Sequence, residues 1–137
     1  MRIHRFIFSI LLMAHGVVHA AQALSYTVLF TGKDGGSYFK KATTPLSPAK
    51  VGLTSMPVPT KKVFFGKSGD FQDWHNAPEP LYIIVLSGVM QIETSKSVVK
   101  NFKAGEILLA KDLTGKGHIT RALNNEKVDY IAMALEG

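Results

Sequence analysis

Two histidines, His75 and His118, are the residues of this chain whose types and surroundings point most directly to chemistry. His75 lies in the stretch DWHNAPEPL, directly before the apolar run LYIIVLSG, and His118 ends the glycine-rich stretch DLTGKGH. An imidazole can transfer a proton near neutral pH, and in its neutral form it binds divalent metal ions. A few polar groups beside an apolar wall are typical of a small-molecule pocket. Both histidines are therefore candidate catalytic or ligand-binding residues.

Two neighbours of these histidines each have alternative roles. Asp112, six residues before His118, is either a turn cap that accepts backbone N–H bonds or a support that orients His118 in a ligand-binding site. Trp74 precedes His75, so in an extended chain its side chain points to the opposite face. The indole then packs against an outer layer or a second subunit, or it stacks on a ligand at the mouth of the pocket.

Short β-strands are the elements that must position these residues. Apolar or alternating segments recur along the chain and are separated by clusters of Gly, Pro, Asp and Asn. This pattern predicts an all-β sandwich or barrel, and no segment after the N-terminus has the 3.6-residue period of a helix. The aromatic residues Tyr38, Phe39, Phe64 and Phe65 are expected in its core. The predicted strands are residues 25–30, 49–56, 61–66, 81–88, 89–94, 97–102, 106–110, 117–123 and 128–135.

The segment 81–86 is apolar on both faces of its predicted strand. Leu81 and Ile83 belong to the set that faces the barrel interior, where they are candidate ligand contacts. The outer set, Tyr82, Ile84 and Leu86, must be covered by a second sheet or by a partner subunit, because such a face is not left in water. The sequence therefore predicts a homodimer.

The first residues, MRIHRFIFSILLMAHGVVHAAQA, have the pattern of a secretory signal peptide: a basic start, a short apolar stretch and small residues before a cleavage site. The alternative is a membrane anchor, but the apolar run is shorter than the roughly 20 residues that a spanning helix needs. We expect cleavage after Ala20, with residues 21–137 forming one domain that is secreted or periplasmic and has no membrane segment.

Composition narrows the function classes further. The chain has no cysteine, which excludes disulfides and thiolate metal sites. Its net charge is +6, but the lysines are scattered and do not form a basic helix face. A nucleic-acid partner is therefore not expected.

Three motifs give the chain a resemblance to the cupin superfamily. GDFQDWHNAPEPLYIIVLSG looks like the first cupin motif, and AGEILLAKDLTGKGHIT resembles the second, with Gly69, His75, Gly88, Gly105 and His118 at matching positions. More narrowly, TGKDGGS, WHNAP and DLTGKGH are similar to motifs of a group of small single-domain cupins. The resemblance implies a jelly-roll barrel, the double-stranded β-helix of cupins. It does not define an activity, because cupins host many chemistries on one fold.

The resemblance also implies where a metal would lie. Metal-binding cupins gather three histidines and one glutamate on the inner wall of the barrel, a donor set that suits first-row divalent ions. Here His75 and His118 match the first and last histidines, whereas Ala77 and Leu81 occupy the places of the second histidine and the glutamate. Three interpretations remain open: a divalent metal held with help from Asp112, a metal-free acid–base or hydrogen-bonding pair, and a purely structural His75.

Two function hypotheses follow from these observations. In the first, the barrel binds, and in an enzyme also converts, a small organic molecule that contacts His75 and His118. In the second, a degenerate cupin acts as a non-catalytic dimeric interaction module. A metal-dependent oxygenase or isomerase would need ligands that the sequence mostly lacks. A pocket open to both histidines would favour the first hypothesis, and a barrel filled by Leu81, Ile83 and other side chains would favour the second.

Overall fold

The computed structural model describes residues 22–68 and 73–136, in which nearly all regular structure is β-strand. The predicted signal peptide and Gly69 lie outside these residues. In the described part of the chain, no helix is long and apolar enough to cross a membrane. The elements are β1 (Ala23–Thr31), β2 (Ser37–Pro45), β3 (Ser47–Ala49), β4 (Gly52–Thr54), β5 (Thr60–Ser68), β6 (Leu81–Ser87), β7 (Val89–Thr94), β8 (Val99–Lys103), β9 (Ile107–Lys111), β10 (His118–Ala122), the short 3₁₀ helix η1 (Leu123–Asn125) and β11 (Val128–Leu135).

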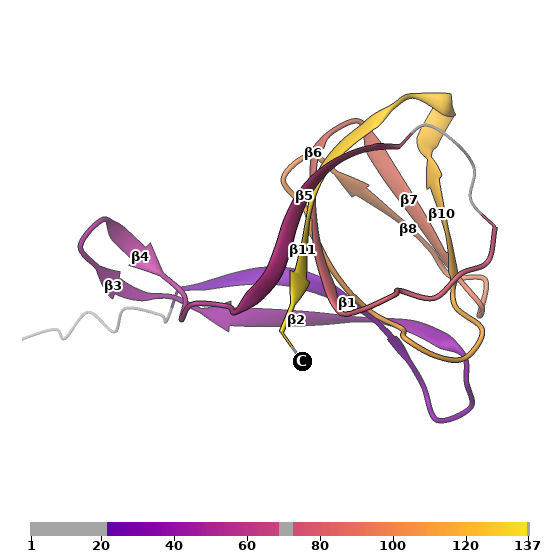
Figure 1. Cartoon of the computed structure of the whole chain (residues 1–137), viewed down its shortest axis with the longest axis horizontal. Coiled ribbons are helices and arrows are strands. Elements are labelled where there is room, and N and C mark those ends of the chain that lie inside the picture. The colour runs from indigo at the N-terminus through magenta and orange to yellow at the C-terminus, as the bar shows by residue number, and fades with distance from the viewer. Residues whose placement is uncertain (1–21, 69–72, 137) are drawn as a thin grey trace, which may run out of the picture.

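Two sheets face each other and form a barrel (Figure 1). The larger sheet has the strand order β2-β1-β9-β6-β11-β5, and the smaller has the order β10-β7-β8. All strand pairs are antiparallel except β1 with β9, which joins the start of the described chain to its later part. The predicted all-β class is confirmed, and the two-sheet barrel is consistent with the jelly roll that the resemblance implied.

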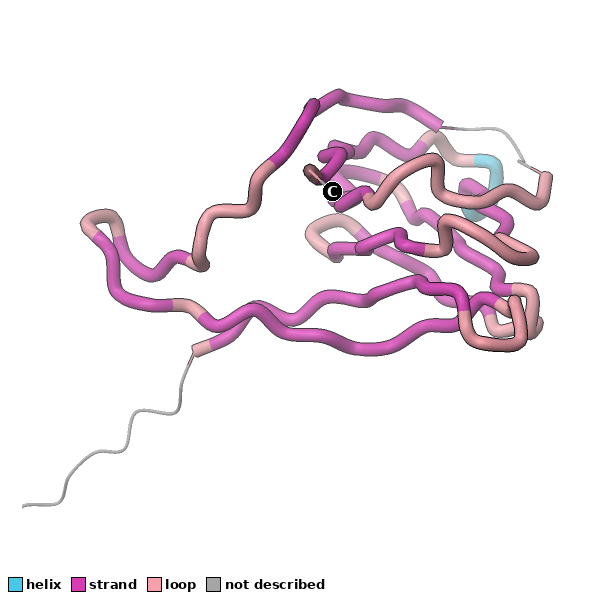
Figure 2. The backbone as a smooth tube through the Cα atoms, turned by 60° about the horizontal axis from the view of Figure 1, so that its bottom comes forward, coloured by secondary structure: helices cyan, strands magenta, loops and turns pink. Residues whose placement is uncertain are grey.

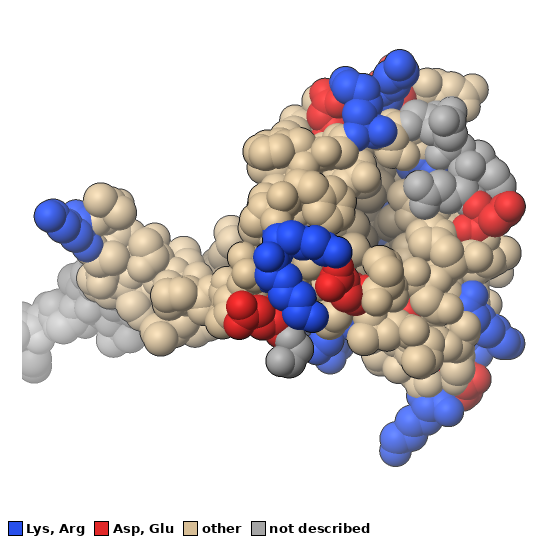
Figure 3. Space-filling model, viewed as in Figure 1, with Lys and Arg blue, Asp and Glu red and all other residues tan. Residues whose placement is uncertain are grey.

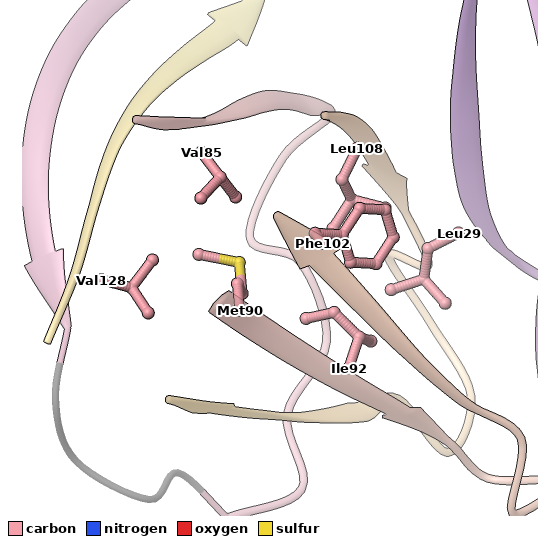
Figure 4. Close-up of a cluster of buried hydrophobic side chains, with 7 residues drawn as sticks. All are labelled: Leu29, Val85, Met90, Ile92, Phe102, Leu108 and Val128. Atoms are coloured by element: carbon pink, nitrogen blue, oxygen red, sulfur yellow. The ribbon is translucent and has the colours of Figure 1, made fainter. Parts of the chain in front are cut away.

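One end of the barrel is filled by a hydrophobic core. Leu29, Val85, Leu108 and Val128 come from the larger sheet, and Met90, Ile92 and Phe102 from the smaller (Figure 4). Side chains of both sheets thus meet between the two layers, as the alternation along each strand requires. The inner face of β6 contributes to two different clusters of buried side chains along the barrel axis. Val85 belongs to this core, whereas Leu81 belongs to a second, smaller cluster with Ala77, Ala110 and Ala134.

The outer face of the larger sheet carries an apolar groove in the described part of the chain. Tyr82 and Ile84 of β6 are half-buried, and Leu86 is 47% exposed. A groove on this face is lined mainly by apolar side chains of β1, β6, β9 and β11. Burial raises the pKa of Tyr82 to about 12, and a hydrogen bond with Tyr26 on this face adds to the shift. This surface is unusually apolar for one that faces water.

The N-terminal part of the barrel continues into a projecting arm (Figures 1 and 2). The long β1–β2 hairpin runs out of the barrel, and the small β3–β4 hairpin lies at its far end. The sequence prediction was wrong here in two respects. Residues 49–56 form part of a hairpin with a turn at 50–51 instead of one strand, because Gly52 adopts a φ of 116° that reverses the chain. The strand β2 was not predicted, since SYFKKATTP lacks a clear apolar alternation.

The exposed surface of β5 also differs from expectation. Phe65 was expected in the core but is 77% exposed, because β5 is an edge strand and Phe65 is on its outer face. Phe39 does pack against the core, whereas Phe64 is 40% exposed and lines the cavity described below instead of belonging to the core. Charged side chains occur in small separate groups on the face shown in Figure 3, where several lysines lie beside acidic residues.

Candidate functional site

A cavity of about 120 Å³ lies in the half of the barrel that the main core does not fill. It exists because alanines occupy inward positions of three segments: Ala77 before β6, Ala110 on β9 and Ala132 on β11. A larger side chain at any of these positions would occupy the space. The other lining residues are Phe64, Ser68, His75, Pro78, Leu81, Ile83, Met90, His118, Thr120 and Tyr130.

The two candidate histidines lie side by side on the cavity wall. Their backbones form an isolated antiparallel bridge, in which His75 N–H donates to the His118 carbonyl at 3.0 Å and His118 N–H donates to the His75 carbonyl at 2.8 Å. Residues paired in this way place their side chains on the same face. The centroids of the two imidazoles are 4.3 Å apart, with the rings inclined at 58°. The structure thus brings together the two residues that the sequence singled out.

His118 is held from behind by Asp112. The Nδ1 atom of His118 lies 2.6 Å from Oδ2 of Asp112, and both side chains are buried, with Asp112 fully inaccessible to solvent. An ionised carboxylate only accepts hydrogen bonds, so Nδ1 carries the hydrogen of this bond. The other carboxylate oxygen, Oδ1, has no hydrogen-bond partner among the described residues. A buried carboxylate with one partner depends strongly on that partner, because an unpaired charge in the interior is costly.

His75 has a matching arrangement with a weaker partner. Its Nδ1 atom lies 2.7 Å from the backbone carbonyl oxygen of Asp73. A carbonyl only accepts hydrogen bonds, so Nδ1 of His75 is also the protonated nitrogen. In their neutral forms, both imidazoles therefore have the Nε2 lone pair available for a proton, a donor group or a metal ion.

Two glycines of the DLTGKGH motif let its loop approach the rest of the site. Gly117 has a φ of 66°, and a Cβ atom there would collide with the carbonyl oxygen of His75. Gly115 has a φ of 81°, and a Cβ atom there would collide with the carbonyl oxygen of Gly35. Glycine is thus required both for the backbone conformation and for the close contact. The contact at Gly117 is what permits the backbone bridge between the two histidines.

The three sequence motifs meet at this end of the barrel and are joined by hydrogen bonds. The buried hydroxyl of Ser37 donates to the Gly117 carbonyl at 2.6 Å, and Thr31 Oγ1 donates to the Thr114 carbonyl at 2.7 Å. The side-chain amide of Asn76 donates to the carbonyls of Asp112 and Thr114 at 2.9 and 2.8 Å. Segments that are 36 to 83 residues apart in sequence therefore form one support for the pair of histidines.

The residues present do not fit the metal centre of three histidines and one glutamate that the resemblance implied. Ala77 and Leu81 both line the cavity beside the histidines, at the places where a third imidazole and a carboxylate would be needed. Asp112 uses its Oδ2 atom to bind His118 and does not line the cavity. In the described part of the chain, no group of three or more His, Cys, Asp or Glu residues is placed to hold a metal ion.

The remaining predicted site residues divide between the cavity and other places. Leu81 and Ile83 line the cavity. Trp74 is 49% exposed and lines a separate shallow pocket with Ser95 and Lys116. Phe64, which the sequence analysis expected in the core, also lines the cavity. Asn76 was not predicted as a site residue, although a polar side chain next to a candidate histidine in the WHNAP motif was a usable signal.

Comparisons with known proteins add structural likenesses only. No family model matches the chain, and no curated protein matches it. Among solved structures, a protein of Neisseria meningitidis, NMB1881, matches with 15% identity and a TM-score of 0.46, covering 54% of this chain and 72% of that one. The cupin domain of Cnp3 from Schizosaccharomyces pombe matches with 10% identity and a TM-score of 0.41, covering 83% and 84%. A protein assigned as ethanolamine utilization protein Q from Salmonella typhimurium LT2 matches with 15% identity and a TM-score of 0.35, covering 85% and 98%.

At these identities and TM-scores, the likenesses say nothing about activity. The structure itself is a two-sheet β-barrel, consistent with the cupin fold, with two adjacent histidines on its inner wall and aliphatic side chains beside them.

Proposed function

We propose that the barrel binds a small, largely apolar organic molecule and that His75 and His118 exchange a proton with it. The observation that carries this proposal is the buried 2.6 Å hydrogen bond from His118 to Asp112, which fixes one imidazole on the wall of a cavity that His75 also lines. An imidazole oriented by a carboxylate is the arrangement that general acid–base catalysis uses. Such a pair needs no metal ion to move a proton.

The size of the cavity limits the ligand. At about 120 Å³ it is smaller than the pockets of roughly 300–1,000 Å³ that hold drug-sized molecules. An engineered apolar cavity of about 150 Å³ binds benzene, so a ligand with about six to eight non-hydrogen atoms is the appropriate size. The walls are mostly aliphatic and aromatic, which favours a ring or a short chain with one polar group directed at the histidines.

The proposed step is a reversible proton transfer. The Nε2 atom of His118 accepts a proton from an acidic O–H or C–H group of the ligand, while the Nδ1–H group stays bonded to Asp112. The carboxylate stabilises the imidazolium that forms, and it holds the ring in the orientation that keeps Nε2 directed away from it. His75, whose centroid lies 4.3 Å away, is the second group that can accept or return a proton.

Phenol and toluene are a matched pair of probes for this proposal. They have the same ring size, but only phenol offers an acidic hydroxyl. We expect phenol to bind more tightly than toluene when both are titrated into the protein and followed by calorimetry and by the NMR signals of the histidine rings. His118→Gln should remove the preference for phenol, and Ala132→Leu should abolish binding of both by filling the cavity. Equal affinity for both probes, or binding of neither, would contradict the proposal.

The apolar outer face of the larger sheet favours a second candidate function, a homodimeric interaction module. Tyr82, Ile84 and Ile107 lie on this face, and its groove has few polar groups. A second copy offers an identical apolar face, and a two-fold axis pairs such faces with each other. We expect light scattering to give a dimer mass at micromolar concentration and Ile84→Glu to give a monomer. A monomer mass for the unmodified protein would exclude this function.

Export is a separate part of the proposal, supported by the basic and apolar pattern of the first residues. The exported form should begin near Ala21. N-terminal sequencing of protein recovered from the periplasm or the medium is the direct test. Intact Met1 on exported, soluble material would reject cleavage.

A further inference from the structure

We infer that Asn76 is a positioning residue that sets the relation between the two imidazoles. Its backbone directly follows His75, and its side chain binds the loop that carries Asp112 and leads to His118. The inference rests on the proposed proton-exchange site and adds to it the residue that holds its two halves together.

Asn76 uses both hydrogens of its side-chain amide for this purpose. The Nδ2 atom donates to the carbonyl oxygen of Asp112 at 2.9 Å and to that of Thr114 at 2.8 Å. The two acceptors are two residues apart on the loop, so one planar group fixes both the distance and the direction of the loop. The side chain is half-buried, and of its two bonds the one to the Asp112 carbonyl is partly buried, whereas the one to the Thr114 carbonyl is exposed.

The consequence reaches both histidines. On one side, the backbone of Asp112 is held while its carboxylate binds Nδ1 of His118 at 2.6 Å. On the other side, the short connection from Asn76 to His75 limits where the His75 ring can lie relative to that loop. The backbone bridge between His75 and His118 and the close approach of Gly117 lie between these two attachments. A change at Asn76 should therefore alter the two rings together.

Thr31, the last residue of β1, provides a comparison because it binds the same loop from another side. Its hydroxyl donates to the Thr114 carbonyl at 2.7 Å, so Thr31 and Asn76 share an acceptor. Thr31 ties the loop to β1, whereas Asn76 ties it to the segment of His75. Removing the Thr31 hydroxyl thus weakens the loop without releasing it from His75, and it separates general loop support from positioning of the histidines.

The test compares Asn76→Ala with Thr31→Val by NMR of protein labelled with ¹⁵N histidine, without any ligand. In Asn76→Ala we expect the His118 Nδ1–H hydrogen to exchange with water roughly tenfold faster or more, the order of effect that loss of two ordinary hydrogen bonds produces. The ring signals of His75 should shift in the same variant. Thr31→Val should leave the exchange rate within about twofold of the original value, since it removes one bond outside the link between the histidines.

Two outcomes would overturn the inference. The first is that Asn76→Ala changes neither the exchange rate of the His118 Nδ1–H hydrogen nor the His75 ring signals. The second is that Asn76→Ala and Thr31→Val change them equally. Asn76→Ser keeps a short donor and is measured if the alanine variant does not fold; we expect an intermediate exchange rate. If neither Asn76 variant folds, the role is general stability and the inference is wrong. Because the measurement needs no ligand, a protein that passes it but does not distinguish phenol from toluene would reject the proposed function alone.

Discussion

Gly117 lies so close to His75 that a side chain at position 117 would collide with the His75 carbonyl oxygen. The same glycine has a φ of 66°, a conformation that other residues adopt only with strain. The contact follows from the exchange of two backbone hydrogen bonds between His75 and His118. A substitution at Gly117 should therefore displace the backbone of His75 without removing any polar side chain of the site.

We expect Gly117→Ala to lower the free energy of unfolding by roughly 1–3 kcal/mol from backbone strain, with a further loss because the His75 carbonyl has to move. Gly105→Ala is the matched control. Gly105 has a φ of 86°, but a Cβ atom there would meet nothing within 4 Å. It should lose about 1 kcal/mol from the unfavourable φ alone. Urea unfolding of the three proteins measures both effects, and equal losses would mean that the contact at Gly117 is unimportant.

The two imidazoles should respond to each other's replacement. Their ring centroids lie 4.3 Å apart, so each ring is part of the immediate surroundings of the other. His118→Gln should therefore change the NMR signals of the His75 ring at a single fixed pH. Thr120→Val changes another residue of the cavity wall and should leave those signals nearly unchanged. His75 signals that do not respond to His118→Gln would mean that the two rings do not lie side by side.

Asp34, in the TGKDGGS motif, should make the stability of the folded protein depend on pH. Hydrogen bonds from Lys96, then Tyr38, then the Gly36 N–H group hold the pKa of this carboxyl well below its usual range. A group with a lowered pKa in the folded state stabilises the protein above its unfolded pKa of about 3.9, and this contribution is lost as the pH falls further. The difference in melting temperature between the original protein and Asp34→Asn should thus be largest near neutral pH and shrink below about pH 4.

The contribution of Asp34 should be modest and sensitive to salt, because the carboxyl is exposed to solvent. Lys96→Met removes its main partner and should reduce the pH dependence in the same direction. A melting-temperature difference that grows on acidification would contradict the assignment of the charge-stabilising contacts.

The aliphatic residues at the metal-ligand positions predict how a metal site could be restored. Ala77→His with Leu81→Glu would place a third imidazole and a carboxylate beside His75 and His118 on the cavity wall. Without metal, the buried carboxylate should destabilise the protein by roughly 1–3 kcal/mol or more. Zn²⁺, Ni²⁺ or Mn²⁺ should restore the stability, since an ion that binds the folded chain shifts the unfolding equilibrium.

Thermal unfolding with and without metal, together with elemental analysis, measures this outcome. The same double change combined with His118→Gln is the control and should bind metal weakly. A folded double variant that gains no metal would show that positions 77 and 81 do not face His118 as we infer. Stoichiometric metal in the unmodified protein would show that two imidazoles recruit further ligands.

Most strands could be predicted because their side chains alternate between a core and a second environment. The run at β6 and the alternation in β7 and β11 are examples, and their predicted ends agree with the structure to within about two residues. Strand β2 could not be predicted from its side chains, since its pairing with β1 is a property of the backbone. The hairpin of β3 and β4 depends on the conformation of Gly52, which composition does not specify.

The sequence predicted most of the residues that line the site, but it did not predict the hydrogen bonds that hold them in place. His75 was identified from its type and surroundings, and the family resemblance pointed to His118 and to the inward face of Leu81 and Ile83. Support of His118 was one of the roles considered for Asp112. The amide of Asn76 and the hydroxyl of Ser37 could not be assigned, because their partners are 36 to 80 residues away in sequence. Such contacts follow from the way two loops approach each other, which depends on the whole barrel.

The parallel pairing of β1 with β9 has a consequence for the order of folding. It joins residues near position 27 to residues near position 108, and the loop that follows β9 carries Asp112 and leads to His118. Contacts between such distant parts of a chain form slowly, because a long loop must close before they contribute any stability. The first hairpin can form early from local contacts, but the two histidines meet only when the barrel closes. A partly folded chain therefore lacks the paired histidines, and the proposed proton exchange would require the closed barrel.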